Sequence, residues 1–285
     1  MHKMKKRYLE ESIFKTLMIT ATVMIAGGLM LILSTIVIKG LPSMSWEMIS
    51  QTPKGGYYLG KEGGILNAIL GSVYLALGAT FLAVMLSLPV VIYMNVYAKK
   101  NSFFSNILRL CFDVMWGIPS IVYGAFGFTV MIFFGIKTSL LAAIIIITIV
   151  ILPVIIRSVD EVVRMISIGL YEASYSLGAT RLQTSVRVIL KQAYPGIITA
   201  VLIAFGRAIG DAAAVLFTAG YTDYIPTSLL QSVATLPLAI FFQLSTPFPE
   251  VQERAYAAAF ILTVIILVIS ILSRFVTRKY KKFRI

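Results

Sequence analysis

Two ionisable side chains, Arg207 and Asp211, lie in an otherwise apolar and small-residue stretch from Gly196 to Gly220. A charge inside a membrane is costly, so such residues are rare and usually face a protein interior or water. At positions i and i+4 of a helix the two side chains share a face and can pair. A guanidinium also keeps its charge and presents paired N–H donors that match an oxyanion. The residues therefore allow two interpretations, an ion pair that holds helices together or a weak passage site for an anion. We favour the passage site.

A second group of residues lies in a long connection between apolar runs, residues 157–194. Glu172, Ala173 and Ser174 belong to a short helical pattern that ends at Gly178, a residue type typical of helix C-termini. A second helical segment is expected to start just after it. Connections of this length usually have a task of their own. We predict a helix-turn-helix knob, and the alternative is a loop that lies on the inner membrane surface.

The composition requires a membrane environment for the elements that position these residues. Hydrophobic residues make up 59% of the 285 residues and charged residues 13%, and the charges separate apolar runs about as long as a bilayer is thick. We predict an all-α bundle of six transmembrane helices. A tail (1–15) precedes the membrane domain (16–276) and a basic tail (277–285) follows it. The predicted spans are Thr16 to Ile38, Leu66 to Tyr93, Leu110 to Phe134, Ser139 to Ile156, Gly196 to Gly220 and Tyr256 to Phe275.

A seventh apolar stretch, Leu229 to Leu244, is too short and too often interrupted by polar residues and proline to be a span. We expect a helix at the outer surface or a re-entrant element there. Small residues recur every four positions in the second and fifth spans, which predicts that these two helices pack centrally. The first and sixth spans are richer in Leu and Ile and are expected to face lipid.

The net charge of +13 describes topology and not nucleic-acid binding, because most Lys and Arg residues fall in segments on one side of the predicted membrane. The positive-inside rule then places both termini in the cytoplasm. A single cysteine, Cys111, and a single histidine, His2, provide neither a disulfide framework nor a metal site. Asp113, at the inner end of the third span, is a weaker candidate for function.

The order Glu172-Ala173-Ser174, then Gly178, then Val188-Ile189-Leu190 resembles the loop signature of ABC importer permeases. The resemblance implies that the knob docks into a cleft on a separate ATP-hydrolysing subunit. Ser174 stands where alanine is usual, and Lys191 stands where proline is common. The chain contains no Gly-x-x-x-x-Gly-Lys-Ser/Thr loop, so ATP and Mg²⁺ are expected on the partner subunit, with no cofactor and no catalytic residue in this chain.

Three stretches resemble phosphate permeases of the PstA type: Gly63 to Ser72, Gly117 to Gly124, and Gly206 to Gly220. Glutamate is usual in that family where Asp211 stands. The resemblance implies a multi-pass permease of the cell membrane, paired with a second similar permease, two ATP-binding subunits and an extracytoplasmic phosphate-binding protein. Two alternatives remain open: a permease for sulfate, molybdate or an amino acid, and an ion-coupled carrier or channel that uses Arg207 and Asp211.

Overall fold

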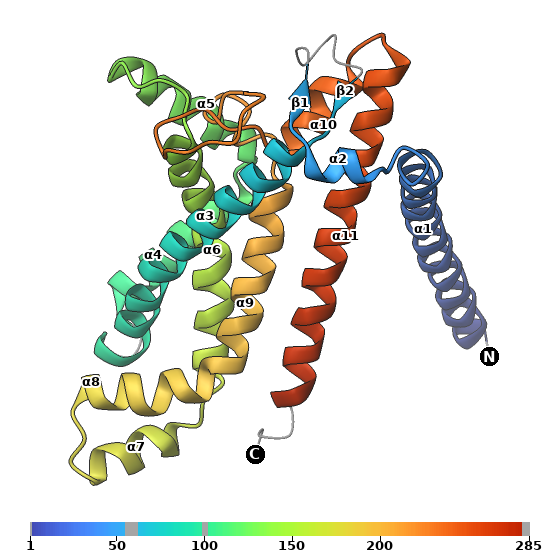
Figure 1. Ribbon diagram of the computed structural model, residues 1–285. Coiled ribbons are helices and arrows are strands. Elements are labelled where there is room, and N and C mark those ends of the chain that lie inside the picture. Colours follow the sequence, from blue (N-terminus) through green and yellow to red (C-terminus); the bar gives the residue numbers. More distant parts are fainter. Residues whose placement is uncertain (1, 55–61, 99–101, 281–285) are drawn as a thin grey trace.

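Helices dominate the computed structural model, which describes residues 2–54, 62–98 and 102–280 (Figure 1). The strands in this part of the chain are the short antiparallel pair β1 (Pro53–Lys54) and β2 (Glu62–Gly63). The helical elements are α1 (His2–Gly40), α2 (Trp46–Ser50), α3 (Leu66–Ile92), the π-helix η1 (Tyr93–Tyr97), α4 (Phe103–Gly117), α5 (Ser120–Phe133), α6 (Leu140–Arg164), α7 (Ile168–Ser176), α8 (Arg181–Gln183), the π-helix η2 (Thr184–Ile189), α9 (Leu190–Gly210), α10 (Leu236–Leu244) and α11 (Pro249–Tyr280).

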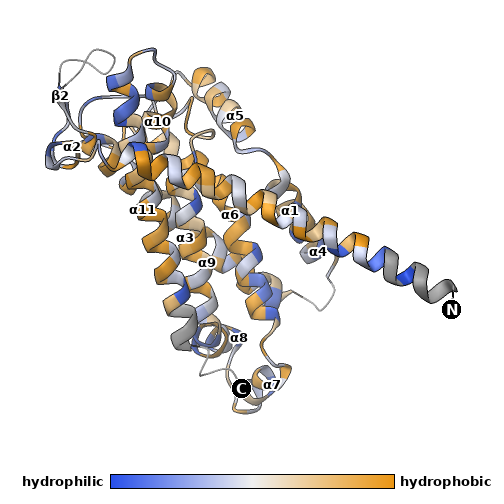
Figure 2. Ribbon diagram, turned by 90° about the vertical axis from the view of Figure 1, so that its right-hand side faces the viewer, coloured by the Kyte–Doolittle hydropathy of each residue, from blue (hydrophilic) through white to orange (hydrophobic). Residues whose placement is uncertain are grey.

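Five helical stretches are long and apolar enough to cross a membrane, and a sixth span results if the bent pair α4 and α5 counts as one. The five are built from α1, α3 with η1, α6, α8 to α9, and α11. Hydrophobic residues cover these helices along their length, and hydrophilic residues gather towards their ends (Figure 2). The prediction of an all-α, multi-pass membrane protein is therefore confirmed.

The core of the bundle lies around α6. In the 18-residue apolar stretch that marks each span, 67% is buried in α6, compared with 39% in α3 and 0% in α1. Helices α3, α6 and α9 pack against one another, and α11 connects them to the peripheral α1 (Figure 1). The central place predicted for the second span is confirmed, because Ala68, Ser72 and Ala76 of α3 are all buried. The central place of the fifth span is confirmed too, because α9 packs against α3, α6 and α11, but Gly206 does not take part, since an added Cβ there would meet nothing within 4 Å.

The third predicted span, Leu110 to Phe134, is wrong as a single helix. Helix α4 ends at Gly117, α5 begins at Ser120, and the two axes differ by 97°. The cause is local, since Pro119 restricts Ile118 to an extended conformation (φ −75°, ψ 128°) in which a helix cannot continue. The α4–α5 arm, residues Phe103–Phe133, is therefore an angled element at the side of the bundle.

The fifth predicted span, Gly196 to Gly220, is wrong at both ends. Its helix begins as early as Arg181 and stops at Gly210. The chain from 211 to 235 then has no regular helix, yet Ala214, Val215 and Ala219 within it are fully buried. We call residues 211–235 the irregular segment.

The irregular segment is held by the N-terminus of α6, where the first N–H groups of a helix have no partner within the helix. The N–H groups of Ser139, Leu140 and Leu141 donate to the carbonyls of Thr218, Gln231 and Leu229, at 3.0, 2.8 and 2.8 Å. Backbone without regular structure is tolerated at membrane depth only where protein or water satisfies its polar groups. Here another helix satisfies them.

The stretch Leu229 to Leu244 is not a seventh span, because its only helix is the nine-residue α10. Leu236, Leu238 and Ala239 of α10 are fully buried, and α10 packs mainly on α11 and also on α3. Of the two arrangements expected, burial within the protein favours a re-entrant element over a helix that lies on the surface.

Helical structure extends into both predicted tails. Helix α1 begins at His2, so residues 2–15 of the predicted N-terminal tail are helical and continuous with the first span. Helix α11 runs to Tyr280, and the remaining residues of the predicted basic tail, 281–285, lie outside the described residues. The N-terminal end of α1 and the C-terminal end of α11 both point towards the end of the bundle that carries α7 and α8 (Figure 1).

Candidate translocation and docking sites

The coupling loop, residues 157–194, forms the helix-turn-helix knob that the sequence predicts. Helix α7 ends at Ser176, and Gly178 takes a left-handed conformation (φ 78°) that other residues rarely adopt. Thr180 then caps α8. It accepts from the N–H of Gln183 while its own N–H donates to the Gln183 side chain, at 2.9 Å. The turn and the restart of the helix are therefore encoded locally.

The departure from the usual motif at Ser174 has a structural role. The Ser174 side chain is buried and its hydroxyl lies 2.9 Å from the hydroxyl of Thr184, which joins α7 to η2. An alanine at this position could not make that bond. Glu172, Ala173 and Gly178 are exposed. The knob therefore turns Ser174 towards its own second helix and leaves Glu172, Ala173 and Gly178 accessible.

Large apolar side chains are exposed on the same knob. Leu177 is 88% exposed, Leu182 63% and Ile168 61%. The knob projects away from the ends of the long helices, as Figure 1 shows for α7 and α8. Apolar side chains gathered on a protruding element are typical of an interaction surface.

Arg207 and Asp211 lie where α9 ends. Arg207 is in the last turn, and Asp211 follows the helix with an extended backbone (φ −81°, ψ 116°). The Asp211 carboxylate accepts from the N–H of Ala214 at 2.9 Å. Within the described part of the chain, the ion pairs include neither residue. The i and i+4 pairing geometry expected on a continuous helix is therefore wrong, because the helix has ended before Asp211.

Arg207 is half-buried and is not sealed in a helix contact. Gly206 beside it faces open space, and Gly210 is exposed. The positive charge of Arg207 acts on the phenol of Tyr123 in α5. The Tyr123 hydroxyl donates to the carbonyl of Met115 at 2.8 Å. Arg207 therefore presents a positive charge on an accessible face at the junction of α9, α5 and the irregular segment.

Helix α5 approaches this junction closely at Gly124. A Cβ on Gly124 would lie 2.6 Å from the carbonyl oxygen of Ala214. The resemblance placed Gly124 at the end of a family motif but assigned it no role, and the structure shows one. Its missing side chain lets the α4–α5 arm reach the irregular segment directly after Asp211.

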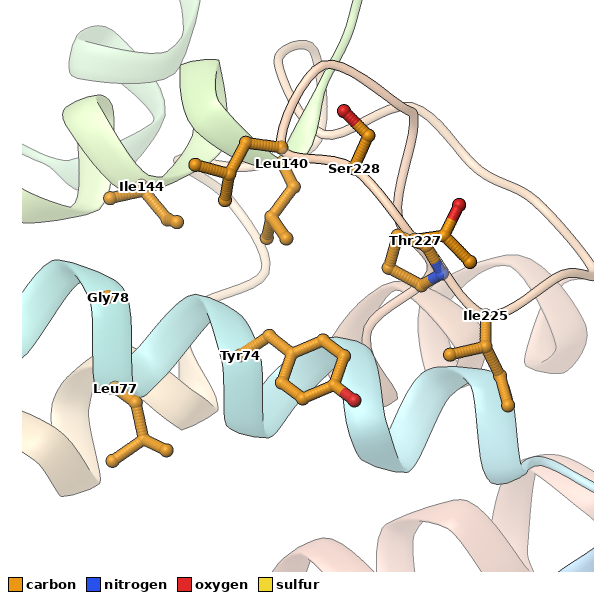
Figure 3. A pocket seen from close by; sticks show the side chains of 10 residues that line it. Tyr74, Leu77, Gly78, Leu140, Ile144, Ile225, Thr227 and Ser228 are labelled. Atoms are coloured by element: carbon orange, nitrogen blue, oxygen red, sulfur yellow. The ribbon is translucent and has the colours of Figure 1, made fainter.

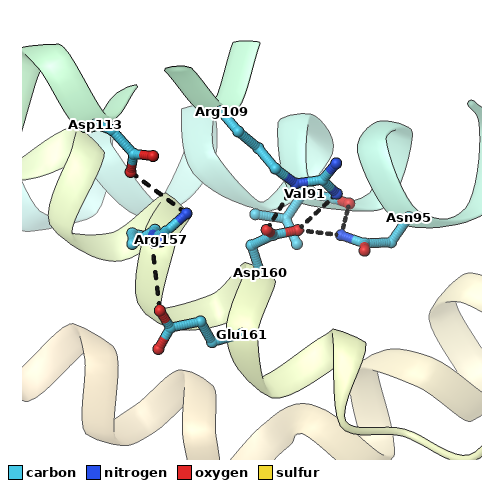
Figure 4. Close-up of polar contacts among 7 residues, drawn as sticks. All are labelled: Val91, Asn95, Arg109, Asp113, Arg157, Asp160 and Glu161. Atoms are coloured by element: carbon cyan, nitrogen blue, oxygen red, sulfur yellow. Dashed lines mark hydrogen bonds and ion pairs between the residues drawn. The ribbon is translucent and has the colours of Figure 1, made fainter. Parts of the chain in front are cut away.

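A polar cluster that the sequence analysis missed joins α3, α4 and α6 near the coupling loop (Figure 4). Asp160 of α6 has a side chain only 2% exposed. It accepts from Arg109 Nε at 2.9 Å, from the second Arg109 nitrogen at 3.2 Å and from Asn95 at 2.7 Å. The one signal in the sequence was a carboxylate at the end of a very apolar run, with no indication of its partners.

Asp113, the weaker candidate, lies beside this cluster and is 45% exposed. Its carboxylate lies 3.3 Å from Arg157, which also contacts Glu161 at 3.4 Å (Figure 4). Exposed ion pairs of this kind contribute little to stability.

Two of the hollows in the described part of the chain lie away from Arg207 and Asp211. An open groove of about 680 Å³ runs between α3, α6 and the loop 225–229, and Tyr74, Leu140 and Ile225 line it (Figure 3). A polar cavity of about 630 Å³ lies where α2 and β1 meet the start of α11, and the buried Arg254 lines it. Arg207 and Asp211 line neither hollow.

The long apolar helices, the projecting helical knob and the accessible arginine at a broken helix end define a multi-pass membrane protein of the transporter permease type. Residues 87–282 match the family described as binding-protein-dependent transport system inner membrane component. The chain belongs to this family.

Sequence relatives support the same family, and solved structures support its fold. The chain is 32% identical over 250 residues to the phosphate transport system permease protein PstA of Yersinia pestis, covering 88% of this chain and 84% of that protein. It is 29% identical to the protein of the same name from Pasteurella multocida, covering 85% of each.

Among solved structures, the inward-facing MetNI methionine ABC transporter matches with a TM-score of 0.61 and 20% identity, over 75% of this chain and 94% of that one. An amino acid ABC transporter matches with a TM-score of 0.57 and 18% identity, over 75% and 92%. At these identities the two structures support the fold alone.

Proposed function

We propose that the chain is the permease subunit of an ATP-driven importer of inorganic phosphate. The observation that carries this proposal is the identity of about 30% to phosphate permeases over most of the chain, which includes the region of Arg207 and Asp211. The solved relatives carry other solutes, but they support only the fold. The sequence relatives therefore decide the substrate class.

Arg207 is proposed as the anion-contacting residue of the path. Its guanidinium has no carboxylate partner within the described residues, and it lies on an accessible face of α9. A planar guanidinium suits phosphate oxygens because two N–H donors bind two oxygens at once. Asp211 contributes a negative charge nearby, which keeps binding weak enough for the ion to leave.

The knob is proposed as the docking site for an ATP-hydrolysing subunit, through Glu172, Ala173, Ser174 and Gly178. Its exposed apolar side chains and its locally encoded turn support a rigid, accessible surface. The N-terminal end of α1 and the C-terminal end of α11 point towards the same end of the bundle as the knob, which supports a cytoplasmic location for all three. A second permease, two ATP-binding subunits and an extracytoplasmic phosphate-binding protein complete the proposed importer.

Radiolabelled phosphate uptake by the assembled complex in vesicles tests this proposal. Uptake should require ATP and the ATP-binding subunits, and excess sulfate should not compete. The variant Arg207→Ala should assemble normally and lose uptake, while Arg274→Ala, which removes an exposed arginine at the far end of α11, should keep it. Uptake driven by an ion gradient without the ATP-binding subunits would show a carrier, and full uptake by Arg207→Ala would remove that residue from the path.

A further inference from the structure

We infer that Asp160 is a positioning residue that transmits movement of the coupling loop to the α4–α5 arm and so to Arg207. The inference rests on the proposed function, because it concerns how ATP hydrolysis on a partner is coupled to passage of the substrate. It assigns a role to a buried carboxylate that neither the path nor the docking surface uses.

The Asp160 carboxylate joins its own helix α6 to α4 and η1. Arg109 of α4 binds both of its oxygens, and Asn95 of η1 donates to one of them (Figure 4). Asn95 also donates to the carbonyl of Val91 at 2.9 Å, which fixes its amide in α3 and η1. Asp160 itself stands on α6, the most buried helix of the bundle. One side chain therefore sets the relative positions of the central helix, the end of α3 and the arm.

Stability alone does not account for this arrangement. A buried ion pair loses so much hydration that replacing it by packed apolar residues is often neutral or stabilising. The surroundings also offer apolar material, since Ile155, Ile156 and Val159 of the same helix are buried within the core. A charged, directional contact defines an orientation that apolar packing would leave adjustable.

The arm depends on this contact for its position. Ser105 is the only residue of α4 that is buried, and its hydroxyl is one of the buried polar atoms without a hydrogen-bond partner in the described chain. Most other α4 side chains, including Phe103 and Leu110, are largely exposed. Leu108 and Phe112 pack partly buried against the core, and Asp113 lies 3.3 Å from Arg157 on its more exposed side. The two bonds from Arg109 to Asp160 are therefore the more buried of the two ion-paired connections between α4 and α6.

The coupling loop contacts the same junction from the other side. A guanidinium nitrogen of Arg181, the first residue of α8, donates to the carbonyl of Tyr97 at 3.4 Å. Tyr97 is the last residue of η1, two positions after Asn95. Both η1 and η2 are π-helices, and such segments are uncommon and frequently occur at functional sites. A shift of the knob would thus reach Asn95, and through it Asp160.

The far end of the arm lies at the candidate path. Gly124 of α5 approaches the backbone of Ala214, and the charge of Arg207 acts on the neighbouring Tyr123. Contacts therefore lead from Arg181 through Asp160 to α4, and the arm extends from there to the surroundings of Arg207. Coupling between these sites is tested by measuring it directly.

The measurement is the amount of phosphate taken up per ATP hydrolysed by the complete importer in vesicles. Asp160→Asn keeps the size of the side chain, removes its negative charge and replaces one acceptor oxygen by an NH2 group, which cannot accept from Arg109 or Asn95. Because hydrogen bonds to charged groups are the stronger class, we expect the ratio to fall at least about tenfold. Subunit assembly and ATP hydrolysis should persist. Glu161→Gln, at the next position on an exposed ion pair, is the matched control and should leave the ratio unchanged.

A double variant separates transmission from a local packing role. Asp160→Asn and Arg181→Ala should each lower the ratio, and together they should lower it no further than the worse single change, because residues in one series are not additive. Should Asp160→Asn fail to assemble, Asn95→Ala, which leaves the Arg109 bonds in place, should still lower the ratio.

Three results would overturn the inference: an unchanged ratio in an assembled Asp160→Asn or Asn95→Ala complex, losses that multiply in the double variant, or an equal loss in Glu161→Gln. A wild-type complex that hydrolyses ATP without taking up phosphate would instead refute the proposed function.

Discussion

Replacing Gly178 by alanine tests whether the turn of the knob determines docking. Gly178 has a φ of 78°, and an added Cβ would meet nothing within 4 Å. The whole effect of the substitution is therefore conformational, and a left-handed conformation costs an L-residue about 1 to 2 kcal/mol. This is comparable to the contribution of the Ser174 to Thr184 hydrogen bond or of the Thr180 cap, each on the order of 1 kcal/mol.

The expected result is weaker docking of the ATP-binding subunit. If the turn must be formed for docking, a loss of 1 to 2 kcal/mol corresponds to between about fivefold and about thirtyfold in the dissociation constant. The assay is a titration of purified ATP-binding subunit onto the permease in detergent. Gly178→Asn should be affected less, because asparagine tolerates the left-handed region better than alanine.

Gly135 provides a matched control for this prediction. It has a φ of 66° and equally open surroundings, but it lies in the turn after α5, outside the coupling loop. Gly135→Ala therefore carries the same conformational cost and should leave docking unchanged. Equal affinity for wild type and Gly178→Ala, or an equal loss in Gly135→Ala, would refute the reasoning.

Two further predictions concern packing and protonation. Gly124→Ala places a Cβ 2.6 Å from the carbonyl oxygen of Ala214, so it should lower the thermal midpoint of the permease. Gly117→Ala is the control and should lower the midpoint little, because its Cβ would meet nothing within 4 Å. Equal midpoints for the two variants would show that the arm does not press on the irregular segment. Burial raises the pKa of the Asp223 carboxyl, and one of its oxygens has no hydrogen-bond partner within the described residues. The stability of the wild type therefore falls as the pH rises above the ordinary pKa of an aspartate. Asp223→Asn should stabilise the protein at pH 7, because it removes the buried charge. Thermal denaturation near pH 3, where the carboxyl is protonated in both states, should show no such gain, and a gain at both pH values would exclude protonation as the cause.

The sequence was most informative where structure is determined by neighbours along the chain. The knob was predicted correctly because a helix end at Gly178 and a restart at Thr180 depend on local backbone and capping preferences. The break between α4 and α5 was also readable in principle, since Pro119 restricts the residue before it. Counting apolar residues hid that signal, because length and hydropathy treat a bent pair and a straight helix alike.

The end of α9 was not predictable in the same way. Residues 211–220 are mostly apolar, and after they leave the helix, backbone N–H groups at the start of α6 donate to carbonyls of the irregular segment such as that of Thr218. Such partners lie far away in the sequence. Asp160 was missed for the same reason, as its partners Asn95 and Arg109 stand on other helices.

The aspartate at position 211 has a consistent physical explanation in the folded chain. Aspartate bonds readily to backbone N–H groups a few residues away, and Asp211 does so with the N–H of Ala214 as the chain leaves α9. A glutamate has one more methylene and would be less suited to this local bond. The carboxylate that could have neutralised Arg207 is thus engaged in shaping the irregular segment. Arg207 forms no ion pair within the described residues and is only partly buried, which the proposed contact with a passing anion requires.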